Sequence, residues 1–198
     1  DAWGCKMCRP FVTILKDIPQ IKDATYISPY LNQIEVKVAE RTVTVPLVLM
    51  GKPGIEFFTG KLLSGSSKSW GTRATAIVNR GTAEKMFGTA NAAGRTFASE
   101  NNGETTIVTL VGVSEDMPDN CTIPNGLYIC DKEDGLTDWS EWSYNTYVRI
   151  DNTVDAEKVL RALKLGFMKS NGISEEQEEQ FDKEVKMKFR LTPVDDIY

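Results

Sequence analysis

The chain has 198 residues, of which 41% are hydrophobic and 26% charged, and its formal net charge is −5. This composition is that of a globular protein that can bury one good core or two small ones. The acidic balance, with no local Lys/Arg cluster, argues against a nucleic-acid surface. The sequence contains no histidine, which excludes Ser-His-Asp and Cys-His catalysis and His-based metal sites. We therefore expect no catalytic, cofactor-binding or metal-binding residues.

The first third of the chain predicts a helix, a strand and a hairpin. "PFVTILKDI" places apolar residues at helical spacing, and residues 23–28 have the composition of a strand. "NQIEVKVAE" alternates apolar and polar residues, and "RTVTVPLVLM" follows after a short polar turn, which is typical of a hairpin. The segment "FFTGKLLSGSSKS" then leads into a Ser/Gly-rich stretch, residues 64–69. We expect a linker and a first domain boundary there.

The middle third begins with "TAIVNRGTAEKMFG", a predicted strand, turn and short helix that stops at Gly88. A phosphate-binding loop needs several glycines with a Gly-Lys-Ser/Thr sequence, and this stretch has one glycine before the helix, so we interpret it as scaffold. "GRTF" and "TTIVTLVGV" flank the turn "SENNGE" and predict a second hairpin. "GLYICD" adds a strand, and the polar "KEDGLTD" predicts a second boundary.

The last third predicts strand, helix and strand. "YNTYVRI" is followed by an amphipathic helix that ends near Gly172 and carries on one face Ala156, Val159, Leu160, Leu163 and Phe167. Ser174 and Gln177 have capping-box spacing. "EVKMKFRL" alternates almost perfectly and predicts a final strand. The outer thirds therefore read as two halves of one split α/β (α+β) lobe, with a second lobe inserted between them.

The four cysteines leave several possibilities open. "CKMC", with Cys5 and Cys8, could be a thiol redox or metal motif, but it precedes any strand, unlike a thioredoxin-like motif. Cys121 and Cys130 flank the turn signal "IPNG", so a disulfide across a hairpin is geometrically plausible. Structural disulfides or unreactive thiols are the simpler interpretation of both pairs.

Two short stretches are candidates for contact with a partner. "DWSEWS" contains the Trp-Ser-x-Trp-Ser pattern of cytokine-receptor modules, but those modules are all-β, and here a helix follows. We expect Trp139 and Trp142 to pack at a boundary between lobes, with an exposed contact patch as the alternative. Asn101 and Asn102, in the "SENNGE" turn, are the second candidate contact.

Several motifs occur in an order that resembles a known family. From about Phe11 to Tyr198, "TAIVNRGTAEKMFG", "GRTF", "TLVGVSEDMP" and "RLTPVDDIY" resemble the MacB-like periplasmic core domain of FtsX/MacB-type ABC-transporter permeases, in the style common in Bacteroidetes. The amino-terminal "DAWGCKMCR" matches no motif of that family.

The resemblance implies a split porter-like lobe, residues 1–68 and 136–198, with a sabre-like lobe, residues 69–135, inserted. It implies an inner membrane protein whose non-catalytic periplasmic domain lies between two transmembrane helices, so that both chain ends face the membrane. The partners would be a cytoplasmic ATPase, reached through the membrane helices, and a periplasmic adaptor or a substrate such as a peptide, lipoprotein or small molecule. Efflux, lipoprotein release and signalling all occur in the family. We expect a mainly monomeric isolated domain.

Two other classes of function stay open from the sequence. A secreted binding or receptor module would be all-β, and a thiol-redox protein would use Cys5 and Cys8.

Overall fold

The computed structural model describes residues 6–28, 32–101, 103–131, 136–151, 153–185 and 187–193. The strands are β1 (Lys6–Met7), β2 (Ile21–Ile27), β3 (Asn32–Val38), β4 (Arg41–Met50), β5 (Leu62–Gly65), β6 (Thr75–Asn79), β7 (Thr96–Asn101), β8 (Glu104–Ser114), β9 (Leu127–Cys130) and β10 (Tyr144–Ile150). The helices are α1 (Phe11–Lys16), α2 (Glu56–Thr59), α3 (Arg80–Phe87), α4 (Ala156–Ser170) and α5 (Glu178–Val185), with short 3₁₀ turns at Ser67–Ser69 and Glu175–Gln177.

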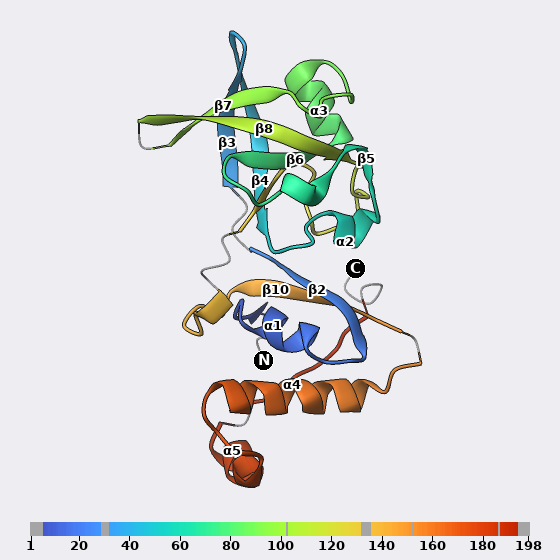
Figure 1. The fold of residues 1–198 in the computed structure, drawn as a ribbon, viewed down its shortest axis with the longest axis vertical. Coiled ribbons are helices and arrows are strands. Elements are labelled where there is room, and N and C mark those ends of the chain that lie inside the picture. The colour runs from blue at the N-terminus through green and yellow to red at the C-terminus, as the bar shows by residue number, and fades with distance from the viewer. Residues whose placement is uncertain are drawn as a thin grey trace.

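Six strands close into a barrel. The hydrogen-bonded neighbours run β4–β3–β7–β8–β6–β9, and β9 returns to β4 in parallel register, Leu47 opposite Leu127 through Met50 opposite Cys130. β5 adds to β8 beyond the end of β7. We call residues 32–131 the barrel lobe, which forms the upper part of the molecule (Figure 1).

Alternating side chains of these strands fill the barrel. Val36, Val45, Val78 and Leu110 are fully buried inside it, as the period of two along each strand requires. Helix α3 closes one end, since Ala83 and Met86 of this helix join the same core.

Both ends of α3 are held by charged side chains. The Asp116 carboxylate accepts a hydrogen bond from the Gly81 N–H at 2.9 Å, and the Arg41 guanidinium donates to the Met86 carbonyl at 3.1 Å. Gly88 ends the helix with φ of 71°, the left-handed conformation that favours glycine. The predicted helix and its stop at Gly88 are confirmed.

The remaining residues, which we call the base lobe, form a three-stranded sheet with helices on one face. β10 is central and antiparallel to both β1 and β2, so β1 and β2 run parallel to each other, joined through α1. Below this sheet lie α4 and then α5 (Figure 1). On the predicted face of α4, Val159, Leu163 and Phe167 are buried, whereas Leu160 is half-buried and Ala156 is exposed. The Ser174–Gln177 capping box is present.

The final strand predicted from "EVKMKFRL" is wrong. α5 continues through Val185, and among residues 187–193 no strand is formed. Met187, Phe189 and Leu191 nevertheless pack against the base-lobe core. The alternation in this stretch therefore reflects the burial of every second side chain, although the backbone does not pair with another strand as we expected.

The mixed α/β class is confirmed, and strand pairing shows how its segments combine. The predicted linker, residues 64–69, includes the second half of β5, and β3 and β4 pair with strands of the middle third and not with those of the base lobe, apart from Ile27 opposite Met50. The predicted boundary at residues 68/69 lies within the range that we call the barrel lobe, and the one at 135/136 follows residues 132–135, which are outside the described part of the chain. The division into units 1–68, 69–135 and 136–198 stays a prediction.

No helix of the described ranges is long and apolar enough to cross a bilayer. Asp1 and Tyr198, whose proximity we predicted, lie outside the described residues.

Candidate functional site

The two lobes meet where β2 of the base-lobe sheet faces the loop after β4. The Thr25 hydroxyl donates to the Gly51 carbonyl at 2.8 Å, and the Gly51 N–H donates to the Tyr26 carbonyl at 2.9 Å. Thr25 and Tyr26 are almost completely buried. A Cβ atom on Gly51 would lie 2.5 Å from Cε1 of the Tyr26 ring, so only glycine allows this approach. We call this contact region the interlobe junction.

Three basic side chains of the base lobe reach across the interlobe junction. Lys16 Nζ donates to the Lys52 carbonyl at 3.2 Å. Arg149 donates to the Phe57 carbonyl, and its guanidinium carbon lies 4.8 Å from the centre of the Phe57 ring. The Phe58 and Tyr147 rings meet edge to face, 5.1 Å apart. Charged hydrogen bonds and ring contacts therefore surround the buried backbone contact.

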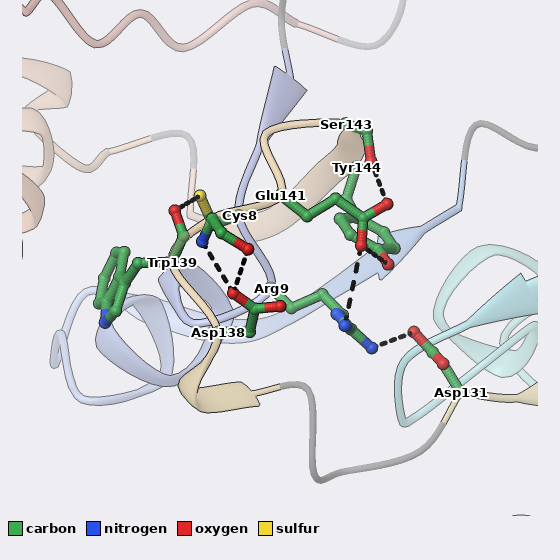
Figure 2. Close-up of polar contacts among 9 residues, drawn as sticks. Cys8, Arg9, Asp131, Asp138, Trp139, Glu141, Ser143 and Tyr144 are labelled. Carbon is green, nitrogen blue, oxygen red and sulfur yellow. Dashed lines mark hydrogen bonds and ion pairs between the residues drawn. The ribbon is translucent and has the colours of Figure 1, made fainter.

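The third basic side chain, Arg9, joins carboxylates from both lobes (Figure 2). Its guanidinium lies 3.2 Å from Asp131, which follows β9 of the barrel lobe, and 3.8 Å from Glu141 of the base lobe. Only 14% of each of the Arg9 and Asp131 side chains is exposed, so the pair is well shielded from water. Burial, the largest single influence, would lower the pKa of Arg9, but Asp131, Tyr144 and Tyr26 together outweigh it and the pKa is raised.

Two phenols complete this cluster. The Tyr144 hydroxyl donates to Glu141 at 2.8 Å, and Arg9 lies over the Tyr144 ring at 5.0 Å. Burial raises the pKa of Tyr144, and Glu141 adds to that effect. Burial and the adjacent Asp131 likewise raise the pKa of Tyr26. The phenols therefore stay protonated at neutral pH, and one guanidinium is shared by two carboxylates. The arrangement is suited to holding the lobes together.

Cys8, the base-lobe cysteine beside this cluster, is in an environment that makes its thiol unreactive. Cys8 is fully buried, and its Sγ donates to the Trp139 carbonyl at 3.3 Å. Burial first, and then Asp138 and Glu141, raises the pKa of the Cys8 thiol to about 11. A thiolate is the nucleophile in thiol exchange, so this environment is the opposite of a redox-active one. Its predicted partner, Cys5, lies outside the described residues.

The structure places Trp139 and Trp142 in an aromatic cluster of the base lobe. Trp139 is half-buried, and its ring centre lies 5.2 Å from those of Phe11 and Phe167. Trp142 lies 5.4 Å from Phe11 and remains 42% exposed. The two residues thus combine packing with an exposed face, and a role in partner contact stays a prediction. Asn102 lies outside the described residues, as does the side chain of Asn101 at the end of β7.

Cys121 and Cys130 pack against the same hydrophobic cluster below the barrel. The Cys130 Sγ donates to the Asp131 carbonyl at 3.4 Å, and the Cys121 sulfur accepts from the Ile123 N–H at 3.4 Å. Both are thiols in this structure, and the disulfide between them stays a prediction for an oxidising environment.

The described residues contain no group of three or more His, Cys, Asp or Glu side chains arranged to hold a metal. A pocket of about 370 Å³ lies beside the start of α3, and its wall includes Asn79, Lys85 and Asp116. Lys85 already donates to the Thr44 carbonyl at 2.7 Å, and one oxygen of Asp116 already accepts hydrogen bonds from Asn79 and Gly81. These groups serve the attachment of α3.

Sequence reasoning missed the interlobe junction. Arg9, Gly51 and Asp131 are far apart along the chain, and we interpreted Arg9 only as part of the amino-terminal stretch and Asp131 only as the end of the strand "GLYICD". The available signal was Gly51, just before Lys52-Pro53. A glycine at such a position can indicate that another part of the chain approaches the backbone closely, but the sequence does not show which part.

No family model matches the sequence, and no curated protein matches it either. Solved structures do match. A domain of a protein assigned as a permease, from Porphyromonas gingivalis, superposes with a TM-score of 0.71 at 21% identity, over 92% of this chain and 74% of that one.

Two further solved structures also superpose on this chain. The extracellular domain of the ABC-type transporter YknZ from Gram-positive bacteria gives a TM-score of 0.56 at 14% identity, covering 87% of this chain and 88% of that one. The periplasmic region of MacB from Actinobacillus actinomycetemcomitans gives 0.55 at 14% identity, covering 90% and 83%. As the resemblance in the sequence predicts, the chain has the fold of the extracytoplasmic domains of MacB- and YknZ-type ABC-transporter permeases.

Proposed function

We propose that this chain is the non-catalytic extracytoplasmic domain of an ABC-transporter permease, and that it passes ATP-driven movement of membrane helices to a substrate or partner outside the membrane. The fold supports the class of protein. The interlobe junction supports the mechanical role, because a lever transmits movement only if its parts are stiffly joined.

The observation that carries the mechanical role is the density of connections at the interlobe junction. Backbone hydrogen bonds through Gly51 are flanked by Lys16, Arg149 and Arg9, each of which bonds to the barrel lobe. A displacement of the base lobe therefore moves the barrel lobe with it. In this proposal the chain is part of an inner membrane protein, its ATPase partner is cytoplasmic, and the barrel lobe works in the periplasm on an adaptor or on a peptide, lipoprotein or small molecule.

The rival functions have less support. An all-β receptor module does not agree with the mixed α/β fold, in which α4 alone has 15 residues. A thiol-redox role does not agree with the raised pKa and complete burial of Cys8.

The test uses the full-length permease with its ATPase in nanodiscs. A dye attached at Glu84→Cys, an exposed position of α3, reports its distance to acceptor dyes on the lipid headgroups by energy transfer. We expect ATP to change the transfer efficiency. Arg149→Ala should reduce the change while ATP hydrolysis continues, and Lys158→Ala, on an exposed turn of α4, should leave both unchanged. An actively hydrolysing complex in which the barrel lobe never moves would refute the mechanical role.

A further inference from the structure

The longest strand of the barrel lobe, β8, extends well beyond its neighbour on one side. β7 pairs with β8 from Asn101 opposite Glu104 to Thr96 opposite Thr109. On the other side, β6 pairs with β8 only from Thr109 onward. No strand among the described residues covers that side of residues 104–108, which we call the β8 edge. Figure 1 shows the β7–β8 hairpin reaching beyond the barrel.

The direction of the backbone groups at the β8 edge follows from the bonds farther along the strand. The Leu110 N–H donates to the Arg95 carbonyl on the β7 side, whereas the Thr109 N–H donates to the Ala74 carbonyl on the β6 side. Backbone groups of successive residues point to opposite sides of a strand. The N–H and C=O groups of Thr105 and Ile107 therefore point outward at the β8 edge, away from β7.

Apart from the charged Glu104, this edge lacks the proline and lysine residues that natural proteins use to prevent pairing. Its sequence is Glu-Thr-Thr-Ile-Val, rich in β-branched residues, without proline, lysine or glycine. β8 is 11 residues long, about twice the usual strand length of 5–6 residues. Ile107 is 58% exposed, the highest value among the exposed large hydrophobic residues of the described chain. The uncovered part, residues 104–108, is short, but its composition is suited to receiving a short extended segment.

We propose that the β8 edge is a docking site for an extended segment of another protein, which adds to the barrel sheet as an antiparallel strand beside β8. Backbone hydrogen bonds to Thr105 and Ile107 supply the affinity, as in other cases of strand addition. The segment carries β-branched side chains beside Ile107 and a basic residue opposite Glu104, the one charged residue of the edge. A second copy of this chain is a poorer occupant, because each copy has a net charge of −5 and the copies repel each other.

This inference does not rest on the proposed function, because it follows from unpaired backbone groups of the isolated domain. The probe is the capped peptide acetyl-Val-Thr-Val-Thr-Lys-amide, whose lysine faces Glu104 in the antiparallel register. We expect saturable NMR shifts and slowed hydrogen exchange at the Thr105 and Ile107 amides, with a Kd of about 1 mM or below. The amides of Thr106 and Val108, which face β7, should change little.

Two kinds of control distinguish pairing through backbone hydrogen bonds from non-specific binding of the peptide. Ile107→Pro removes one outward N–H, which an edge position tolerates, and should weaken binding about tenfold or more. Ile107→Val keeps the N–H and should bind like the original chain. The same peptide, N-methylated at the residues that face the edge, should not bind.

Three results would overturn the proposal. The first is no response at Thr105 and Ile107 at millimolar peptide. The second is a response at Thr106 and Val108, which would mean that the peptide displaces β7. The third is concentration-dependent self-association through these amides without peptide, which would assign the edge to a second copy. None of these results bears on the ATP-driven movement measured with the full-length permease.

Discussion

The core inside the barrel and the core of the base lobe contain similar numbers of buried hydrophobic residues but are covered differently. Among the described residues, fourteen buried residues form the barrel core, and only four partly buried ones pack around it. The base-lobe core has fifteen buried residues and twelve partly buried ones around it, including Trp139, Met187 and Phe189. A closed sheet wraps its own core, whereas an open three-stranded sheet depends on helices and loops to cover its margins.

This difference suits the two lobes to different roles. The barrel lobe is a unit whose stability is largely internal, while the base lobe presents a broad margin of half-covered apolar side chains. Under the proposed function, the base lobe is the part next to the membrane helices, and such a margin is able to pack against them. The following changes test that contrast, from the largest expected effect to the smallest.

The largest effect should come from the barrel core. Leu110→Ala removes a fully buried side chain from a closed barrel that cannot collapse onto the gap, so we expect a loss of about 2–5 kcal/mol in the free energy of unfolding. Leu165→Ala, at the half-covered margin of the base lobe, should cost about 1 kcal/mol or less, since less apolar area leaves water there. Urea unfolding measures both. Equal losses would mean that the two cores are covered equally well.

The next effect should come from the interlobe junction. Gly51→Ala places a Cβ atom 2.5 Å from the Tyr26 ring and should cost about 1–3 kcal/mol through overpacking. Tyr26→Leu in the same chain removes the obstructing ring, so the double variant should be more stable than the sum of the single losses predicts. Simple additivity would show that the two lobes do not press together at this point.

A smaller effect is expected at the charged cluster. Arg9→Met keeps much of the side-chain volume but leaves Asp131 and Glu141 without their shared cation, and should cost about 1–2 kcal/mol. Lys158→Met, which removes an exposed ion pair with Asp155 at 3.8 Å, serves as the control and should change stability by about 0.5 kcal/mol or less. High salt should reduce the Arg9 effect only slightly, because the pair with Asp131 is shielded from solvent. If the two variants lost the same stability, Arg9 would not contribute to holding the two lobes together.

The smallest effect at neutral pH concerns the Cys8 thiol, which influences stability only in alkaline solution. The pKa of Cys8 is about 11 in the folded chain against 9.0 as its ordinary value, so the folded state keeps a proton that the unfolded state has lost. Stability should therefore fall as pH rises from about 9 to 11, and be unaffected by this group below that range. Cys8→Ala should make the fall less steep, although Tyr26 and Tyr144, whose pKa values are also raised, contribute above pH 10 in both chains. Unfolding curves at closely spaced pH values measure the slope, and identical slopes would contradict the burial of a neutral thiol.

Much of the local structure could be predicted from the sequence. The β3–β4 and β7–β8 hairpins, the face of α4, the Gly88 stop and the Ser174 capping box follow from periodicity and from residues with special backbone or capping preferences. These are short-range features, in which each signal and its structural consequence lie within a few residues of each other.

The closure of the barrel could not be predicted, because the sequence pattern of a strand does not show which other strand it pairs with. The parallel pairing of β4 with β9 joins residues about eighty positions apart, and β3 meets β7 over only two residue pairs. The same limit explains the missed junction: the shape of the Tyr26 ring determines why residue 51 is glycine, and nothing near Gly51 in the sequence indicates that ring. The alternation in "EVKMKFRL" failed for a related reason, since it specifies which side chains are buried but not whether the backbone has a strand beside it.

The insertion of the barrel between β2 and β10 has an evolutionary and practical consequence. The barrel lobe starts at Asn32 and ends at Asp131, and both ends lie next to the base lobe, at β2 and at Arg9 respectively. The elements α1, β2, β10 and α4 make up a complete framework around that single interruption. Such a module is exchangeable: another domain with closely spaced ends, or a longer or shorter barrel, is able to occupy the same place without altering the framework below it. Under the proposed function, related proteins can therefore differ in the partners that they contact by exchange of the barrel lobe alone, while the base lobe next to the membrane helices stays the same.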